Sequence, residues 1–203
     1  MQGRLLIIGA GGQAREMRQL ATVTGIATTT PTWLVDREDE DRVLDLISYA
    51  DSSYQIVLGL GHPDQRLRAW RKWRTVTGDG WVSLVHPRAD VGDSTRIGAG
   101  ATIASGVVTT CDIVLEDGVL LNYNVTIGHD VRIGVCSVIN PGATISGGVT
   151  VGEGVLVGTG ANVLEGITIG DGATVGAGAV LTKDVPAGEV FAGVPARRMG
   201  FHQ

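Results

Sequence analysis

The sequence predicts an α/β domain with a parallel sheet followed by a parallel β-solenoid, and three observations lead to this fold class. The segment 1–85 alternates strand-like and helix-like patterns, and from position 91 an aliphatic residue returns at every sixth position. Glycine accounts for 31 of the 203 residues, which is about twice its usual share of roughly 7%. Proline numbers only six, so the glycines suit regular tight corners better than a flexible linker.

The N-terminal segments follow the order strand, helix, strand, helix, strand, helix, which is typical of a parallel sheet covered by helices. The expected strands are residues 4–8, 32–35, 55–58 and 81–85, and the expected helices are residues 12–22, 41–50 and 64–76. Basic residues between Arg66 and Arg74 scatter around the last helix, and we expect them to face solvent. Composition changes abruptly at His86 and Pro87. We therefore divide the chain into an α/β domain (1–85), a β-solenoid domain (86–185) and a C-terminal tail (186–203).

The six-residue repeat keeps its register from end to end, and Thr109 is its one non-aliphatic member. The repeated positions are Val91, Ile97, Ile103, Thr109, Leu115, Leu121, Ile127, Ile133, Ile139, Ile145, Val151, Val157, Val163, Ile169, Val175 and Leu181. A smaller residue follows four positions later, as at Val107 and Ala143. Helices of period 3.6 and strands of period 2 cannot sustain a period of six, whereas a short strand plus a corner can.

Gly or Asn often comes directly after the repeated aliphatic residue, as at Gly92, Gly128 and Asn140. These residues tolerate left-handed backbone at least cost, so we expect them at the corners. The repeat resembles the hexapeptide β-helix family over its whole length. That resemblance implies a left-handed helix with three sides, about 18 residues (three hexads) per coil and about five coils.

Composition indicates a cytoplasmic protein with a small-molecule ligand. The net charge of −5 gives no general electrostatic reason to bind nucleic acid or an anionic membrane. The start has no signal-peptide pattern, and no apolar run approaches the roughly 18 residues that span a bilayer. Cys111 and Cys136 are too few for a disulfide framework and are expected to be reduced thiols.

A glycine-rich turn follows the first strand, in the segment Gly9-Ala10-Gly11-Gly12-Gln13-Ala14. Its N–H groups could hold an anion at the start of the next helix, or the glycines could serve a tight turn alone. Asp36 closes the second strand and Gly61 follows the third, so both should meet Gly11 at one edge of the sheet. Because the sheet has only half the strands of a dinucleotide-binding domain, a mononucleotide or nucleotide-sugar fits better than NAD.

The repeat contains a single histidine, His129, and Asp130 follows it. Histidine can accept a proton near neutral pH, and a neighbouring carboxylate can fix its tautomer. With three hexads per coil, His129 stacks between Cys111 and Gly147, while Asp130 lies beside Gly148. Two glycines over this pair should leave a notch in which an acceptor and a thioester could meet.

Nearly the whole chain resembles the bacterial acetyltransferases that modify nucleotide-linked amino sugars or sialic acid. The resemblance is carried by GAGGQARE at the start, NYNVTIGHD, NPGATISGGVTVGEGVLVGTGANV and the ending AGVPARRM. It implies a homotrimer, with acetyl-CoA as cosubstrate in the groove between neighbouring prisms and the nucleotide-sugar substrate in the α/β domain. His129 resembles the general base and Asp130 its acidic neighbour. Matching acceptor-binding positions are Gly11, Gly12, Gln13, Asp36, Arg37 and Gly61, and matching positions for backbone contacts to CoA are Thr159 and Ala177.

We therefore expect an enzyme in which His129 deprotonates the amine of a nucleotide-linked amino sugar as it attacks acetyl-CoA, with Gly147 N–H at the oxyanion. No metal is expected, because a metal hydratase on such a helix needs three histidine ligands and the repeat offers one. Alternatives are an O-acetyltransferase acting on sialic acid or a related sugar, and a noncatalytic trimeric nucleotide-sugar-binding protein. Gln13 stands where many relatives have His, so the resemblance predicts the type of reaction more directly than it predicts the acceptor.

Overall fold

The computed structural model describes residues 4–26, 32–34 and 54–200. Its N-terminal part is a parallel sheet in which β1 (Arg4–Ile8) lies between β2 (Thr32–Leu34) and β3 (Tyr54–Leu58). Helix α1 (Gly12–Val23) follows β1, and α3 (Pro63–Thr77) with a short 3-10 turn (Gly78–Gly80) follows β3. The expected parallel α/β arrangement is confirmed for these elements. The expected helix 41–50, residue 35 and the predicted site residues Asp36 and Arg37 lie outside the described residues.

Both helices pack one apolar face against this sheet. The buried residues of α1 recur at helical spacing, at Ala14, Met17, Leu20 and Ala21. Helix α3 begins with Pro63 at its first turn, a position that does not need the missing N–H. Its Trp70 and Trp73 pack into a second apolar cluster.

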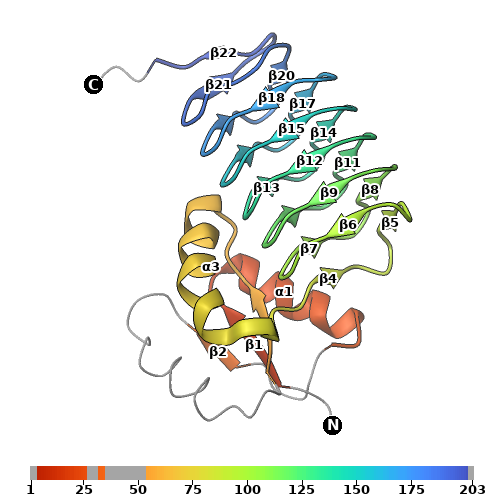
Figure 1. Ribbon diagram of the computed structural model, residues 1–203, viewed down its shortest axis with the longest axis vertical. Coiled ribbons are helices and arrows are strands. Elements are labelled where there is room, and N and C mark those ends of the chain that lie inside the picture. The colour runs from red at the N-terminus through yellow and green to blue at the C-terminus, as the bar shows by residue number, and fades with distance from the viewer. Residues whose placement is uncertain (1–3, 27–31, 35–53, 201–203) are drawn as a thin grey trace.

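The rest of the chain is a three-sided solenoid whose coils stack away from the α/β part toward the C-terminus (Figure 1). The first side contains β4 (Leu84–Val85), β7 (Thr102–Ile103), β10 (Leu120–Leu121), β13 (Val138–Ile139), β16 (Leu156–Val157), β19 (Thr174–Val175), β21 (Val190–Ala192) and β22 (Arg197–Arg198). The second side contains β5 (Asp90–Val91), β8 (Val108–Thr109), β11 (Thr126–Ile127), β14 (Thr144–Ile145), β17 (Asn162–Val163) and β20 (Val180–Leu181). The third side contains β6 (Arg96–Ile97), β9 (Val114–Leu115), β12 (Arg132–Ile133), β15 (Thr150–Val151) and β18 (Thr168–Ile169).

Strand pairing confirms three hexads per coil, since Thr126 pairs with Val108 below and Thr144 above. The solenoid is longer than the five coils expected, with about six. One added strand is β4, which lies within the strand expected at 81–85 but belongs to the solenoid and not to the α/β sheet: Val85 pairs with Ile103 in the same register, one hexad before Val91. The other is β21, which was not expected. Its Val190 pairs with Thr174, two positions short of the separation that a full coil requires, so the hexad count breaks after Leu181.

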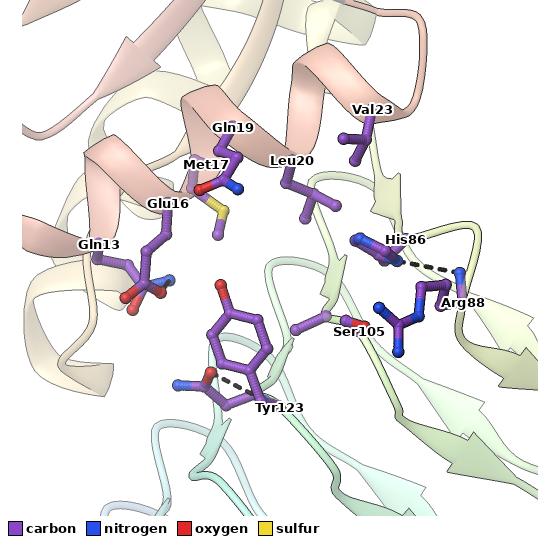
Figure 2. A pocket seen from close by; sticks show the side chains of 12 residues that line it. Gln13, Glu16, Met17, Gln19, Leu20, Val23, His86, Arg88, Ser105 and Tyr123 are labelled. Atoms are coloured by element: carbon purple, nitrogen blue, oxygen red, sulfur yellow. Dashed lines mark hydrogen bonds between the residues drawn. The ribbon is translucent and has the colours of Figure 1, made fainter.

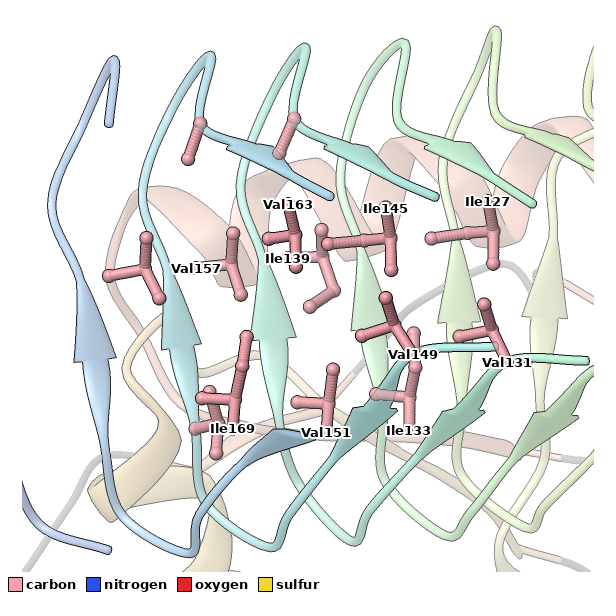
Figure 3. Packing of buried hydrophobic residues seen from close by; sticks show 14 of the residues in the cluster. Ile127, Val131, Ile133, Ile139, Ile145, Val149, Val151, Val157, Val163 and Ile169 are labelled. Carbon is pink, nitrogen blue, oxygen red and sulfur yellow. The ribbon is translucent and has the colours of Figure 1, made fainter. Parts of the chain in front are cut away.

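The repeated aliphatic residues and the smaller set point into the prism and form its core, as Figure 3 shows for Ile127, Val131 and Ile133. The exception is Ile97 near the first coil, which is exposed. Thr109, the one non-aliphatic member of the repeat, is buried. Its hydroxyl lies 3.1 Å from that of Thr95 and accepts the N–H of Gly92. The pattern thus predicts the core correctly, and a hydroxyl is tolerated because it finds partners.

The expected left-handed positions were misplaced by two positions along the repeat. Positive φ occurs at the third position after the aliphatic residue, at Gly106, Gly142 and Gly160, and also at Asp112, Asn124, Asp130 and Cys136. Glycines directly after the aliphatic residue have another role: a Cβ on Gly128 would lie 2.7 Å from the nitrogen of Gly147 in the next coil. Close stacking of the coils, and not backbone handedness, requires glycine there.

The α/β part covers the first side of the prism. Outward-facing Thr102, Leu120 and Val138 of that side are buried, whereas the equivalent Thr126 and Arg132 of the other sides are exposed. Helix α3 lies along the corner between the third and first sides, through ion pairs from Arg71 to Glu153 and Arg74 to Asp117. The basic face of α3 was therefore wrongly expected to be fully solvated, because it contacts the prism.

Candidate active site

A cavity of about 550 Å³ opens at the carboxyl ends of β1 and β3. It is lined by Gly9, Ala10, Gly11, Gly12, Gln13, Gly59, Leu60, Gly61, His62 and Gln65. The four described residues among the predicted acceptor-binding positions therefore meet at one place. We refer to it as the acceptor cavity.

The glycines around the acceptor cavity stand there for different physical reasons. A Cβ on Gly9 would lie 2.5 Å from the oxygen of Gly59, and one on Gly59 would lie 2.7 Å from Ile7, so the βα turn needs both. Gly11 has φ −77°, an ordinary value, and a Cβ added to it would meet no atom within 4 Å. The turn alone does not explain Gly11, which instead leaves open space at the first N–H groups of α1.

A second cavity of about 230 Å³ lies between α1 and the first coils of the prism (Figure 2). Gln13 lines both cavities, so the two are neighbours at the start of α1. Tyr123 projects into it toward Glu16, and partial burial raises the pKa of Tyr123, with the Glu16 carboxylate raising it further. His86, Arg88 and Ser105 close its other side.

His129 and Asp130 lie at the corner between the second and third sides, which we call the His129 corner (residues 111, 129, 147 and 165). The Nδ1 atom of His129 is 2.8 Å from Oδ2 of Asp130. Their side chains are 58% and 67% exposed, so a substrate can reach both. Asp130 has φ +56°, a left-handed conformation that Asp tolerates better than most residues.

The His129 ring lies directly over Gly147 of the next coil. A Cβ on Gly147 would be 2.5 Å from Nε2 and Cε1 of the imidazole, so only glycine allows the ring this place. The two glycines were expected to leave a notch over the pair, and the histidine ring itself fills the space at Gly147. The stacking order of the coils is the one expected, because Asp130 N–H donates to the backbone carbonyl of Cys111 and Gly148 N–H donates to the backbone carbonyl of His129.

Corner N–H groups differ between the three edges of the prism. At the corner along α3, carboxylates accept some of them: Asp117 accepts the N–H of Ala99 at 2.9 Å and Asp171 accepts the N–H of Glu153 at 2.8 Å. The N–H groups of Asp117 and Asp171 themselves donate to no group among the described residues. At the His129 corner, the N–H groups of His129 and Gly147 donate to no group among the described residues. The remaining corner lies between the first and second sides, and we call it the Thr159 corner (residues 105, 123, 141, 159 and 177). Toward the C-terminal end of the prism its N–H groups are also unpaired among the described residues.

Thr159 and Ala177, the positions expected to contact CoA, stack at the Thr159 corner, where Gly178 N–H donates to the Thr159 carbonyl at 2.8 Å. Their own N–H groups donate to nothing among the described residues. They are therefore separated from His129 by the whole second side of the prism. Arg198, near the end of the chain, is paired with Glu189.

Within one chain the predicted residues form three separate groups, at the acceptor cavity, at the His129 corner and at the Thr159 corner. In a three-sided prism the His129 corner is opposite the first side, and the first side carries the α/β part with the acceptor cavity. Sequence reasoning did not find Glu16, Tyr123 or Arg88. The sequence spacing could have indicated two of them. Glu16 lies one helical turn after Gln13, and Tyr123 lies two coils before Thr159 in the same corner.

The described residues contain no group of three His, Cys, Asp or Glu side chains placed as metal ligands would be. Neither helix that the structure describes has the length and apolar character needed to cross a bilayer.

Known proteins resemble this chain in both sequence and structure. Residues 148–183 match the family described as bacterial transferase hexapeptide (six repeats). The acetyltransferase domain of PglB from Neisseria gonorrhoeae, solved with acetyl coenzyme A, is 31% identical over 98% of this chain and 100% of that chain, with a TM-score of 0.89. PerB from Caulobacter crescentus, solved with CoA and GDP-perosamine, is 29% identical over 98% and 99%, with a TM-score of 0.86. WeeI from Acinetobacter baumannii is 25% identical over 97% and 99%, with a TM-score of 0.81. No curated protein sequence matches the chain significantly.

Proposed function

Because this chain belongs to the hexapeptide-repeat sugar acetyltransferases, left-handed β-helix enzymes that use acetyl-CoA, we propose that it acetylates the amine of a nucleotide-linked amino sugar with His129 as general base. The observation that carries the assignment of the base is the contact between His129 Nδ1 and Asp130 at 2.8 Å. When Nδ1–H donates to the carboxylate, Nε2 keeps its lone pair and can accept a proton. This tautomer is the one a general base requires.

In the proposed reaction the acceptor amine attacks the thioester carbonyl of acetyl-CoA directly. A C–N bond forms, the C–S bond breaks, and the amine proton passes to His129 Nε2 and then to the departing CoA sulfur. Asp130 stabilises the imidazolium that forms in between. Gly147 N–H, which has no acceptor among the described residues and lies beside the ring, is available to donate to the oxyanion of the tetrahedral intermediate.

Geometry favours an assembly in which neighbouring chains complete each site. The acceptor cavity and His129 are on opposite faces of one prism, so a single chain cannot bring its own acceptor to its own base. A homotrimer resolves this, because the His129 corner of one chain can face the α/β part of another. We therefore propose a homotrimer with three composite sites.

The acceptor in this proposal lies along α1. Its nucleotide part occupies the acceptor cavity at Gly11, Gly12, Gln13 and Gly61, with Asp36 and Arg37 completing the site from outside the described residues. The sugar then extends past Gln13 into the cavity beside Tyr123. GDP-perosamine, bound in PerB, is an example of the acceptor class we propose.

Acetyl-CoA in this proposal lies between two prisms, along the Thr159 corner of one chain and the His129 corner of its neighbour. The N–H groups of Thr159 and Ala177, free within the described part of the chain, support the assignment, since the amide and phosphate oxygens of CoA need donors. The domain roles in this proposal are acceptor binding by residues 1–85 and acetyl transfer by residues 86–185. Residues 186–203 are the tail, whose β21 and β22 extend the first side of the prism.

The test is CoA release with a panel of UDP-, dTDP- and GDP-linked amino sugars and free sialic acid. We expect turnover with at least one nucleotide-linked amino sugar and a product acetylated on nitrogen. Turnover with sialic acid alone and an acetyl ester as product would support the O-acetyltransferase alternative. Acetyl-CoA binding without turnover on any member would favour the noncatalytic protein.

A further inference from the structure

Arg66 is the one charged side chain that is fully buried among the described residues, with an exposed fraction of 0%. It reaches from the first turns of α3 to the junction of α3, the end of β3 and the prism. Its Nε and Nη2 atoms donate to the Gly118 carbonyl at 3.0 and 2.7 Å. Its Nη1 atom donates to the carbonyls of Leu58 at 3.3 Å and Leu60 at 2.8 Å. Every acceptor is a neutral backbone oxygen.

The positive charge of Arg66 has no counter-charge in the described part of the chain, where no carboxylate lies within ion-pair distance of it. Cys136 is the one titratable group that opposes its loss of charge, but burial raises the pKa of the Cys136 thiol to about 12. Burial also lowers the pKa of Arg66 to about 10, so the guanidinium stays protonated near pH 7. A buried charge without an opposite partner is costly, and hydrogen bonds to carbonyls offset only part of that cost.

The carbonyl of Leu60 connects Arg66 to the acceptor cavity, because Leu60 and Gly61 both line that cavity. In a trans peptide the C=O and the following N–H point in opposite directions. The Leu60 carbonyl faces Arg66, so the Gly61 N–H points away from Arg66. That N–H donates to no group in the described residues. Gly61 thus offers a free donor beside the free N–H groups at the start of α1.

We propose that Arg66 is a positioning residue for the diphosphate of the acceptor. It holds the Leu60–Gly61 peptide so that Gly61 N–H donates to a phosphate oxygen, and its charge lies behind that peptide as the counter-charge of the anion. The inference rests on the proposed function, in which this cavity holds the nucleotide part of the acceptor. It also gives the buried charge its missing partner, which is the substrate itself.

The alternative role for Arg66 is to fasten α3 to the prism. Arg71 provides the matched control, because it pairs with Glu153 across the same interface, is exposed and does not line the cavity. If Arg66 only fastens α3, replacing it should weaken the binding of every ligand of the α/β part to the same extent. If Arg66 positions the phosphate donor, replacing it should weaken the binding of nucleoside diphosphates more than that of nucleosides.

The test compares wild-type enzyme with Arg66→Met, Arg66→Lys and Arg71→Gln by calorimetric titration with UDP, GDP and dTDP, and with the matching nucleosides. For the nucleotide that wild type binds, we expect Arg66→Met to weaken nucleoside diphosphate binding about tenfold or more, a loss of roughly 1.4 kcal/mol. We expect the nucleoside to lose much less. Arg66→Lys, which keeps the charge with fewer donors, should lie in between. Arg71→Gln and the acetyl-CoA affinity of all variants should match wild type.

Equal losses for nucleoside and nucleoside diphosphate, or unchanged diphosphate binding in Arg66→Met, would overturn the inference while leaving the proposed function intact. If wild type binds no nucleoside diphosphate at all, the proposed acceptor class fails and the inference fails with it. If Arg66→Met does not fold, a crystal structure of wild type with the bound nucleoside diphosphate decides. We expect a phosphate oxygen within hydrogen-bond distance of Gly61 N, and a diphosphate held elsewhere would contradict this.

Discussion

Two corners of the same prism, built from the same six-residue repeat, differ in whether carboxylates accept their backbone N–H groups. At the corner along α3, carboxylates accept the N–H groups of Ala99, Val135 and Glu153. At the His129 corner the N–H groups of His129 and Gly147 stay free within the part of the chain that the structure describes. A backbone donor that is already satisfied can stabilise the fold but cannot bind a substrate oxygen. We therefore interpret the corner along α3, where three N–H groups are already bonded, as structural, and the His129 corner as the one open to a ligand.

The largest expected effect comes from removing the proposed base, His129, at the open corner. His129→Ala should lower kcat by roughly 10²–10⁴-fold, the usual worth of a general base, with the KM for acetyl-CoA little changed. Steady-state CoA release measures it. The matched control is Cys111→Ser, because Cys111 is exposed in the same corner, one coil below. Near-normal kcat in His129→Ala would remove the base assignment, and a large loss in Cys111→Ser would point to a thiol in the reaction.

A smaller but more specific effect is expected from Gly147→Ala. The added methyl group would lie 2.5 Å from Nε2 and Cε1 of His129, too close for nonbonded atoms, so the ring must move. Displacing a catalytic group by about 1 Å can cost about 10²-fold in rate. The same substitution in a His129→Ala background should cost nothing further, because no ring remains to be displaced. Additive losses in this double-mutant cycle would show that Gly147 acts independently of His129.

Asp130→Asn should lower kcat about tenfold, well below the roughly 10⁴-fold loss of a buried triad aspartate, because this pair is exposed to water. An amide can donate to Nδ1 and so favour the tautomer with the proton on Nε2, which is the wrong one for a base. The kcat measured across the pH range checks the assignment. An unchanged kcat at every pH would mean that the contact between His129 and Asp130 has no part in the reaction.

The smallest effect on catalysis is expected at the structural corner. Asp117→Ala removes the acceptor for Ala99 N–H and the ion pair with Arg74. We expect a loss of about 1 kcal/mol in the free energy of unfolding, typical of one hydrogen bond, and unchanged kcat. Thermal unfolding and CoA release measured on the same preparation separate the two. A kcat loss like that of Gly147→Ala would contradict the division between the corners.

Much of the fold was predictable because a period of six constrains every residue it includes. The inward positions follow from counting alone, and the stacking of His129 on Gly147 follows from counting once the resemblance to the hexapeptide family supplies three hexads per coil. The acetyl-CoA-dependent sugar acetyltransferase family is confirmed by the relatives. The left-handed positions were misplaced because glycine serves two needs in this coil, and its presence does not say which.

Residues whose role depends on packing between the two parts of the chain could not be predicted. Arg66 resembles its exposed neighbours on α3 in sequence, and only the placement of that helix against Gly118 buries it. Nor does the repeat indicate which side the α/β part covers. That choice puts the acceptor cavity and His129 on opposite faces, and the two-chain site that we propose depends on it.

The most direct test of the composite site is complementation between two inactive variants. Gly11→Phe should fill the acceptor cavity without backbone strain, since Gly11 has an ordinary φ and open space around it, while His129→Ala removes the base. Each variant alone should be nearly inactive. Coexpressed and assembled at random, they should recover activity in about a quarter of the sites, where an intact cavity meets an intact histidine from a neighbour. Mixed assemblies that form but stay as inactive as the separate variants would contradict the account.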